Sequence, residues 1–318
     1  MARGSIHRIF NCYWLKAILM KHKYFKRGGK GSVKPYIIAC IDNKRNTLGM
    51  TDRFQGIITS YAVSKIFKTE FKCIYNFPFE LREFLIPNKY NWEVKPNELS
   101  EYSKDVEIVI LRKSPTIKPL LNKLPTKKQV YVYANLNYLD KINKQFNTNF
   151  LWRDVFNELF KPTQLLQDNI DLHLKAIGEE YIACVFRFQS LLNDFKEYNF
   201  SEIKDNNAKE VLINKNIKKI EEIISEYKMP VLVTSDSATF LERAKKIKGV
   251  YVIPGKVVHM GCSFNESNVV YLKSFVDFFM ISKAKSVYCI GTKEMYPSKF
   301  PEYAAKLGNT PFERIILE

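Results

Sequence analysis

An arginine stands where the sequence looks most like a buried core. The apolar run YIACVF (181–186) predicts an interior strand, and Arg187 follows it directly. A buried guanidinium needs a partner, because burial of an unpaired charge is costly. Phosphate oxygens would suit it, since a guanidinium can donate two parallel hydrogen bonds to them. A structural carboxylate such as Asp194, seven residues further on, would also suit it. The residues leave both alternatives open.

Two further clusters suit a phosphate or a nucleotide. In NTLGMTDRFQGI, Gly49 ends a loop and Asp52 and Arg53 open a helix, whose N-terminus would offer free N–H groups to a phosphate. In VLVTSDSATF, Asp236 and Ser237 follow a strand, and Asp236 is suited to accept hydrogen bonds from a nucleobase or a ribose. The structural alternatives are a capped helix with Arg53 in solvent, and Ser237 as an ordinary helix cap.

A fourth cluster lies near the end of the chain. Asp277 leads a helix that is apolar on one face, and Ser298 follows the next predicted strand. Ser298 and the N–H groups beside it would form a second helix terminus for phosphate. The alternative is a helix that begins at Pro297, is capped by serine and packs on the sheet.

The elements that would position these clusters alternate between short β-rich runs and helices. Strands are predicted at 36–41, 71–76, 106–111, 129–134, 181–186, 229–235, 249–254 and 286–291. Helices are predicted at 51–68, 138–147, 151–177 with a break at Pro162, 207–228, 237–247, 267–283 and 298–307. Apolar strands between helices indicate parallel sheets covered on both faces. Two such halves predict an α/β fold of two Rossmann-like domains facing across a cleft, with ligands at the carboxyl ends of the strands.

The predicted domains are a basic segment at 1–34, an N-terminal Rossmann-like domain at 35–165 and a C-terminal one at 166–318. The net charge is +17, and residues 1–34 hold nine Lys and Arg and no acid. This segment has no uncharged run long enough to span a bilayer and no secretory cleavage site. Either it is an amphipathic helix lying on an anionic membrane, or it is a first helix packed on the body of the protein.

The cysteines and histidines predict neither disulfides nor a metal site. The six cysteines form no CxxC pair, and three of them lie in predicted buried strands, which suits a reducing cytoplasm. The four histidines are far apart and have no metal-ligand spacing.

In order and placement, the four clusters resemble motifs of the GT-B glycosyltransferases of the fucosyltransferase superfamily, which includes α1,2-, α1,6- and protein O-fucosyltransferases. Small bacterial members look most similar. FRFQSLLNDF is similar to the arginine-containing first motif, VTSDS resembles the second, and DFFMISKAKSVYCIGTKEMYPSKFPEYAAKLG resembles the third. GMTDRFQGI is similar to a glycine-bearing loop near the N-terminus. The chain departs from the common pattern at Val185, where many members have histidine, and at 295–297, where many have small residues.

The resemblance implies an inverting transferase that moves fucose from GDP-fucose to a glycan acceptor in cell-surface polysaccharide or glycoconjugate synthesis, with no metal or other cofactor. Arg187 would bind the diphosphate and stabilise the leaving group. The base for the acceptor hydroxyl would be Asp194 or His259. The other implied nucleotide-sugar-binding residues are Gly49, Asp52, Arg53, Asp236, Ser237, Asp277 and Ser298.

Two alternatives remain. The net charge and an aromatic content of 14% permit a non-catalytic protein that binds nucleic acid or another polyanion. Against this alternative, the basic residues are spread over both halves and no nucleic-acid-binding motif occurs, so no nucleic acid is expected. The second alternative is a GT-B transferase for another nucleotide sugar. The expected location is the cytoplasm, with residues 1–34 in peripheral contact with the anionic inner face of the cytoplasmic membrane.

Overall fold

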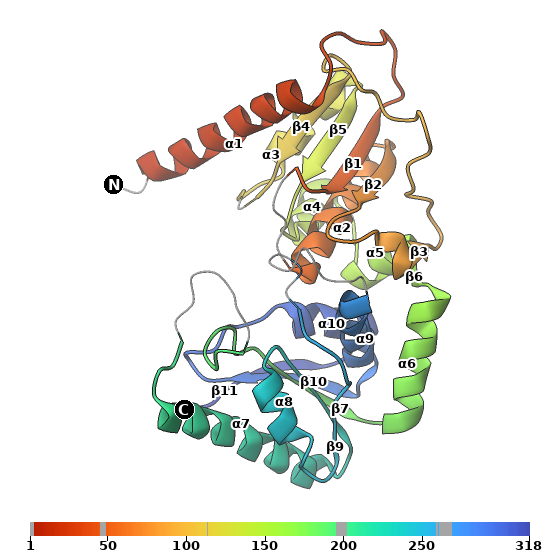
Figure 1. The fold of residues 1–318 in the computed structure, drawn as a ribbon. Helices are drawn as coiled ribbons and strands as arrows, with labels where there is room; N and C mark the ends of the chain where they lie inside the picture. Colours follow the sequence, from red (N-terminus) through yellow and green to blue (C-terminus); the bar gives the residue numbers. More distant parts are fainter. Residues whose placement is uncertain (1–2, 45–48, 113, 195–201, 259, 261–268) are drawn as a thin grey trace. The chain divides into compact units, whose positions relative to one another are not determined.

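The computed structural model divides the chain into two compact units. It describes residues 3–44, 49–112, 114–194, 202–258, 260 and 269–318. Unit 1 comprises Met1–Lys161 and unit 2 comprises Pro162–Glu318. Each unit contains its own parallel sheet with helices packed against it (Figure 1).

Unit 1 is built on a four-stranded sheet. In sheet order its strands are β2 (Glu70–Tyr75), β1 (Tyr36–Ile41), β5 (Gln129–Tyr133) and β4 (Val106–Ile110), and all neighbours are parallel. Every residue of β1 and β5 is buried, because helices and loops cover both faces of a central parallel strand. The other elements are α2 (Met50–Ile66), η1 (Leu81–Glu83), β3 (Leu85–Pro87), α3 (Lys118–Leu121), η2 (Leu124–Thr126), α4 (Leu139–Phe146), α5 (Trp152–Leu159) and β6 (Phe160–Pro162), which pairs with β3.

Helix α2 lies very close to the loop that follows β5. A Cβ atom placed on Gly56 would lie 2.0 Å from the carbonyl oxygen of Ala134. Only glycine allows so close an approach of helix and backbone. The hydroxyl of Thr59, one turn further along α2, donates to the carbonyl oxygen of Leu136 at 3.0 Å. Helix α2 is therefore fixed against the carboxyl end of the sheet of unit 1.

The first helix, α1 (Arg3–Tyr24), packs on the edge strand β4. Ala17 and Met20 are buried in a cluster with residues of β1, β4 and β5. Lys21 forms an ion pair with Glu107 of β4 at 3.0 Å. The basic N-terminal segment thus contains a helix packed on the body, as the second interpretation of that segment expects.

Unit 2 is built on a five-stranded parallel sheet. In sheet order its strands are β11 (Phe312–Ile316), β10 (Ser286–Gly291), β7 (Ile182–Phe186), β8 (Val231–Ser235) and β9 (Val250–Tyr251). Its helices are α6 (Gln164–Ile177), α7 (Asn206–Tyr227), α8 (Ala238–Ala244), α9 (Val269–Lys283) and α10 (Phe300–Gly308). Helices α6 and α10 both pack on α9.

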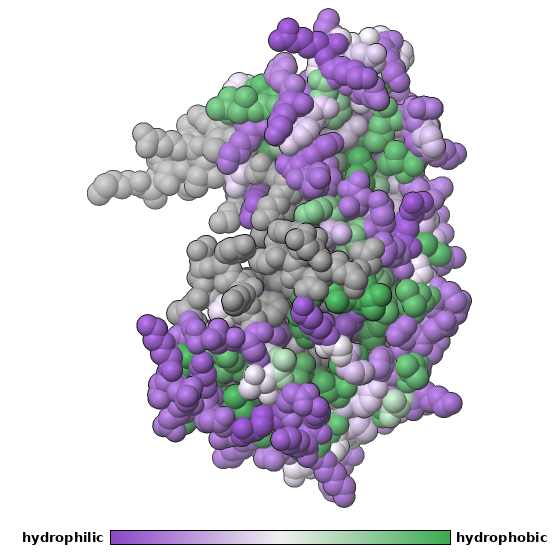
Figure 2. Space-filling model, in the orientation of Figure 1, coloured by the Kyte–Doolittle hydropathy of each residue, from purple (hydrophilic) through white to green (hydrophobic). Residues whose placement is uncertain are grey.

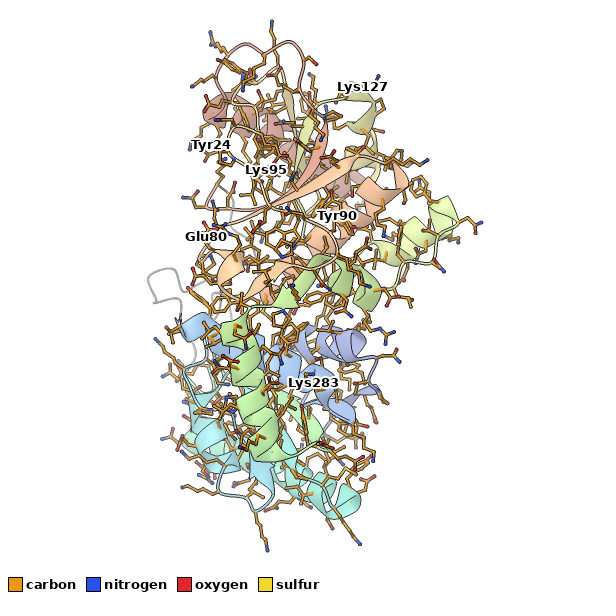
Figure 3. The ribbon with its side chains drawn as sticks, turned by 90° about the vertical axis from the view of Figure 1, so that its right-hand side faces the viewer. Tyr24, Glu80, Tyr90, Lys95, Lys127 and Lys283 are labelled. Carbon is orange, nitrogen blue, oxygen red and sulfur yellow. The ribbon has the colours of Figure 1, made fainter. Side chains whose placement is uncertain are left out.

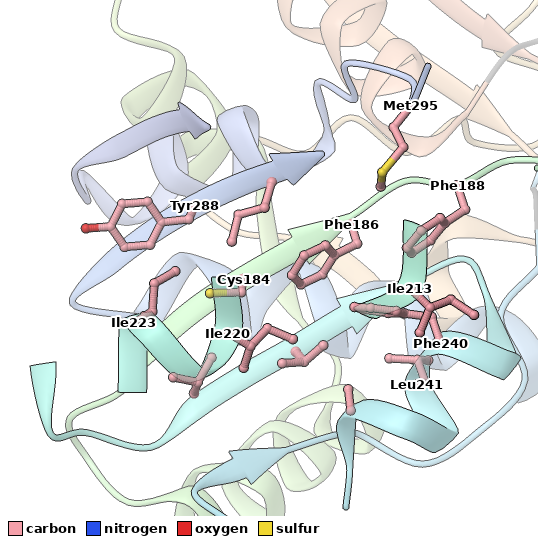
Figure 4. Close-up of a cluster of buried hydrophobic side chains, with 14 of the residues drawn as sticks. Cys184, Phe186, Phe188, Ile213, Ile220, Ile223, Phe240, Leu241, Tyr288 and Met295 are labelled. Atoms are coloured by element: carbon pink, nitrogen blue, oxygen red, sulfur yellow. The ribbon is translucent and has the colours of Figure 1, made fainter. Parts of the chain in front are cut away.

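Alternate residues of β7 belong to opposite faces of the sheet. Ile182, Cys184 and Phe186 lie in one hydrophobic cluster with residues of α7 and α8. Figure 4 shows the ring of Phe186 beside those of Phe188 and Phe240. This aromatic group holds the segment that follows β7 against α8.

Most of the expected elements occur, with small shifts at their ends. The helix expected at 151–177 is interrupted as predicted, because α5 ends at Leu159 and α6 begins at Gln164. The strand expected at 249–254 has only two residues, Val250 and Tyr251, since it lies at the edge of the sheet. Strands β3, β6 and β11 were not predicted. Apart from Leu85 and Phe160, their residues are partly buried or exposed, so they lack the apolar run that marks a central strand.

Candidate nucleotide-binding site

The sheet of unit 2 has a point at which the chain changes direction. From β7 in the middle, the chain continues to β8 and β9 on one side, and then crosses to β10 and β11 on the other. In open α/β sheets, ligands bind outside the carboxyl ends of the two strands at such a point. Here those ends are Phe186 of β7 and Gly291 of β10. The residues that follow them are the candidates for ligand contact.

Arg187 lies at this point. Its carbonyl oxygen accepts a hydrogen bond from the N–H of Tyr296 at 3.3 Å, which joins the loop after β7 to the loop after β10. Its guanidinium pairs with Asp236, with 3.0 Å between Nη1 and Oδ2. The side chain of Arg187 is 17% exposed and that of Asp236 is 2% exposed. The arginine is therefore anchored by a buried carboxylate and is still open to solvent on one side.

Asp236 accepts hydrogen bonds from the backbone as well as from Arg187. The N–H of Phe188 donates to Oδ1 at 2.8 Å and the N–H of Gln189 donates to Oδ2 at 2.7 Å. Burial raises the pKa of the Asp236 carboxyl, and Arg187 and these N–H groups counteract the rise. Asp236 thus holds both the guanidinium of Arg187 and the backbone that follows it.

The Asp194 carboxylate accepts hydrogen bonds at the start of α8. Its Oδ2 accepts from the hydroxyl of Ser237 at 2.7 Å and from the N–H of Thr239 at 2.7 Å, at the start of α8. Ser237 is the N-cap of α8, and its hydroxyl accepts from the N–H of Phe240. The sequence offered Asp194 as the structural acid for Arg187, but the acid that pairs with Arg187 in the structure is Asp236. Asp194 instead fastens the loop after β7 to α8. Asp194 remains exposed and Ser237 is fully buried.

Asp277 lies in a buried ion pair on α9. The Nζ of Lys273, one turn earlier, is 3.0 and 2.8 Å from the two carboxylate oxygens, and both side chains are less than one-tenth exposed. Burial raises the pKa of Asp277, and the Lys273 ammonium counteracts the rise. Nearby, Nδ1 of His173 on α6 lies 2.7 Å from the hydroxyl of Tyr251. Asp277 is therefore part of a polar group enclosed between α6, α9 and β9.

Ser298 precedes α10, which begins at Phe300 rather than at 298. Its hydroxyl accepts from the N–H of Phe300 at 3.2 Å, and its carbonyl oxygen accepts from Nη2 of Arg314 at 3.0 Å. Pro301 lies in the first turn of the helix, where its missing N–H costs no hydrogen bond. Ser298 is only partly buried, at the start of a helix that follows the loop after β10.

Three expected residues belong to unit 1. Gly49 is the N-cap of α2 and provides no side-chain cap, and Asp52 lies in the first turn. Arg53 is 1% exposed, which corrects the alternative that placed it in solvent. Its Nη1 donates to the carbonyl oxygen of Phe77 at 2.8 Å and to the hydroxyl of Tyr75 at 3.1 Å.

His259 lies outside the residues that the structure describes. Within the described ranges, no three or more His, Cys, Asp or Glu side chains are grouped so that they could hold a metal ion.

Sequence reasoning missed Lys273 and Tyr296. Lys273 precedes Asp277 by four residues, the spacing at which helical side chains meet, so this ion pair could have been read from the sequence. Tyr296 contributes through its backbone N–H, which carries no mark in the sequence.

No family model matches the chain, and neither does any curated protein. Solved structures do match it. A mutant of FUT1 from Arabidopsis thaliana in complex with GDP has a TM-score of 0.56 and 13% identity, over 96% of this chain and 75% of that one. The α1,6-fucosyltransferase NodZ from Bradyrhizobium, soaked with GDP-fucose, has a TM-score of 0.51 and 12% identity, over 87% and 93%. POFUT1 in complex with GDP-fucose has a TM-score of 0.51 and 9% identity, over 91% and 99%.

These matches cover both units of the chain at low sequence identity, so they establish its fold. The chain has the GT-B fold seen in these fucosyltransferases, which confirms the predicted α/β class and the resemblance in fold.

Proposed function

We propose that the protein is an inverting glycosyltransferase that uses GDP-fucose as its donor and needs no metal. The observation that carries the proposal is the Arg187–Asp236 pair at the switch point of unit 2, where a partly exposed guanidinium is held in place beside the loop after β10. The fold supports it, because NodZ and POFUT1 share that fold and were studied with GDP-fucose.

In the proposed reaction, an acceptor hydroxyl oxygen attacks the anomeric carbon of fucose while the bond from that carbon to the diphosphate oxygen breaks. The hydroxyl proton passes to a base, and GDP leaves with the bonding electrons. Arg187 would offset the negative charge that develops on the diphosphate. Because Asp236 already fixes the guanidinium, little reorganisation would be needed as the bond breaks.

The base and the other binding residues remain proposals. Asp194 is an exposed carboxylate and is a candidate base, as is His259. Ser298 and the N-terminus of α10 would contact phosphate. Asp236, Ser237 and Asp277 would support the nucleotide, mainly by fixing the loops around it, since each of them is buried. Gly49, Asp52 and Arg53 would act on the donor or the acceptor from unit 1.

The proposed acceptor is a glycan in the synthesis of a cell-surface polysaccharide or glycoconjugate. The proposed location is the cytoplasm, with peripheral membrane contact through residues 1–34. Among the described residues, no helix combines the length and the apolar character needed to cross a membrane.

Thermal-shift and calorimetric titrations with GDP, GDP-fucose and UDP test the donor. GDP and GDP-fucose should stabilise the protein, and UDP should stabilise it less. Arg187→Ala should weaken GDP binding by about 10- to 100-fold, the worth of one or two charge-assisted hydrogen bonds. Arg187→Lys should recover only part of the loss, because an ammonium cannot bind two oxygens in a fork.

Arg243→Ala is the matched control, because Arg243 forms an exposed ion pair with Glu210 on the surface of unit 2. It should leave the GDP affinity unchanged. A wild-type protein that binds UDP more tightly than GDP would point to a GT-B transferase for another donor, and one that binds neither nucleotide would contradict the proposal.

A further inference from the structure

Helix α1 has an apolar face on each side. Ala17 and Met20 face the body of unit 1 and are buried. On the other side, Trp14, Leu15 and Leu19 are 63%, 52% and 59% exposed. Figure 2 shows hydrophobic surface at the described end of α1, among hydrophilic residues. Single exposed leucines are common, but three large apolar side chains on one helix face indicate a surface that contacts something.

The order of residues around α1 places this apolar strip between lysines. Successive residues of an α-helix are about 100° apart, so Trp14, Ile18, Leu15 and Leu19 lie in one sector around the axis, with the exposed His22 between Ile18 and Leu15. Lys23 and Lys16 come next on one border of the strip, and both are exposed. Lys21 borders the strip on the other side, next to the buried face.

A second basic segment meets α1 at that border. Residues 112–128 contain six Lys and Arg and no acid. Lys123 and Lys128 of this segment and Lys21 of α1 all contact Glu107 of β4, at 3.0, 3.4 and 3.0 Å. These lysines lower the pKa of Glu107 despite its burial, so the carboxylate is ionised at neutral pH. One negative charge is thus shared by three positive charges.

Two further lysines of the second segment are exposed. Lys118 begins α3 and Lys127 follows η2. Lys127 lies at the outside of unit 1 in Figure 3. Among the described residues, neither lysine has a carboxylate within 4.0 Å of its ammonium group. Through Lys123 and Lys128, the second segment therefore lies against the side of β4 on which α1 packs, and it carries two exposed positive charges in addition.

We infer that this surface docks on an anionic lipid bilayer. The name α1 face is used for Trp14, Leu15, Ile18 and Leu19 with Lys16 and Lys23. Tryptophan and leucine side chains would enter the boundary between headgroups and acyl chains, and Lys16 and Lys23 would reach the anionic headgroups. The lysines of residues 112–128 would add electrostatic attraction within a Debye length of the surface.

Other occupants fit the α1 face less well. A second copy of the chain would bring two acid-free basic helices together, and their like charges would repel. A nucleic acid would contact the lysines but would leave Leu15 and Leu19 without a role. A bilayer has both an apolar phase for the strip and anionic headgroups for the lysines beside it.

The proposal concerns unit 1 and does not depend on the donor that unit 2 binds. If both proposals hold, the bilayer is also where a lipid-linked glycan acceptor would be met. GDP affinity measured in solution and vesicle binding measured without nucleotide separate the two, so that either can fail alone.

Vesicle co-sedimentation of the full chain tests the apolar strip. The protein should bind phosphatidylcholine vesicles containing phosphatidylglycerol and bind pure phosphatidylcholine much more weakly. Leu15→Ser/Leu19→Ser should reduce binding to the anionic vesicles by about tenfold or more, because it removes apolar surface without changing charge. Leu165→Ser/Leu172→Ser is the matched control on α6, where these leucines are 53% and 61% exposed. It should bind like the wild type.

A second pair of variants tests the basic segment. Lys118→Gln/Lys127→Gln should weaken anionic vesicle binding by about tenfold, and the loss should shrink as salt rises. Lys248→Gln/Lys283→Gln removes the same charge from exposed positions of unit 2 and should have little effect.

Three results would overturn the inference. One is equal binding of the wild type to neutral and anionic vesicles. Another is an equal loss of vesicle binding in a test variant and in its matched control. That result would show that the effect comes from non-specific hydrophobic adsorption or from net charge. The third is a concentration-dependent dimer, or an oligonucleotide complex, that forms in the wild type and is abolished by Leu15→Ser/Leu19→Ser. Circular dichroism of each variant establishes that its fold is intact.

Discussion

The direction of the Arg187 guanidinium is set by Asp236. The register of the sheet pairs Phe186 of β7 with Ser235 of β8, so the residues that follow them, Arg187 and Asp236, are neighbours at the same edge. Asp236 also accepts from two N–H groups of the loop after β7. Removal of its charge should therefore change both the orientation of Arg187 and the loop that carries it.

Asp236→Asn should weaken GDP binding by about tenfold and lower the free energy of unfolding by about 1–3 kcal/mol, because Arg187 loses its carboxylate partner but keeps some solvent contact. Isothermal titration with GDP well below the melting temperature separates the two effects. Asp205→Asn is the control, since Asp205 caps α7 in the same unit and can be replaced by another good N-cap. A GDP affinity equal to that of the wild type would show that Asp236 does not position Arg187 for the nucleotide.

His173 should make stability depend on pH. Burial lowers its pKa from 6.5, with Lys273 also lowering it and Asp277 opposing the change; Tyr251 is its hydrogen-bond partner. As pH falls below about 6.5, the unfolded chain takes up the proton first, so the folded state loses stability until the folded pKa is passed. The contribution of neutral His173 is complete above that range.

Melting temperatures of the wild type and His173→Gln, measured from about pH 8 to pH 5, test this expectation. The wild type should be the more stable at the upper end, and its advantage should shrink towards the lower end. Leu165→Ala, at an exposed position of the same helix, α6, changes no titratable group and should run parallel to the wild type. Parallel curves for His173→Gln would contradict a lowered pKa at His173.

The individual site residues were recognisable from the sequence, but their partners were not. Arg187 was expected to need a carboxylate or a phosphate, and Asp194, seven residues further on, was the acid proposed. The acid that pairs with it lies 49 residues away, directly after the next strand, β8. Pairing of this kind depends on the register of β7 with β8, which no local pattern specifies.

At the scale of elements, the contact between α2 and the loop after β5 leaves no room for a methyl group. Gly56→Ala should lower the free energy of unfolding by about 3 kcal/mol, because its Cβ would overlap a backbone carbonyl that cannot rotate away. Chemical denaturation measures the loss. Lys65→Ala, on the exposed side of the same helix, should change stability by less than about 1 kcal/mol. A stable Gly56→Ala variant would show that α2 can move away from Ala134.

Elements in the interior of the sheets were predictable because their apolar runs are nearly continuous, as in β1, β5 and β8. Elements at the edges of the sheets were harder to predict from the sequence. Strand β11 has no buried residue, only partly buried and exposed ones, and β9 consists of two residues. The sequence also left undecided whether α1 packs on β4, because basic amphipathic helices suit protein and membrane surfaces equally well.

At the scale of the whole molecule, the alternation of strands and helices predicted the α/β class and the division into two halves. The resemblance of short motifs pointed to the GT-B fold, which the structural matches establish. The donor and the acceptor are not determined by the fold, because they depend on a few side chains in loops around the carboxyl ends of the strands. This is why Arg187 and its neighbours carry the proposals.

The distribution of tryptophan gives the two units different optical properties. All three tryptophans, Trp14, Trp92 and Trp152, lie in unit 1. Trp92 and Trp152 are buried, whereas Trp14 is exposed on α1. Intrinsic tryptophan emission therefore reports the unfolding of unit 1 and does not report the unfolding of unit 2. Trp14 is in addition a built-in probe, because its emission should shift to shorter wavelength when its indole leaves water for a lipid interface.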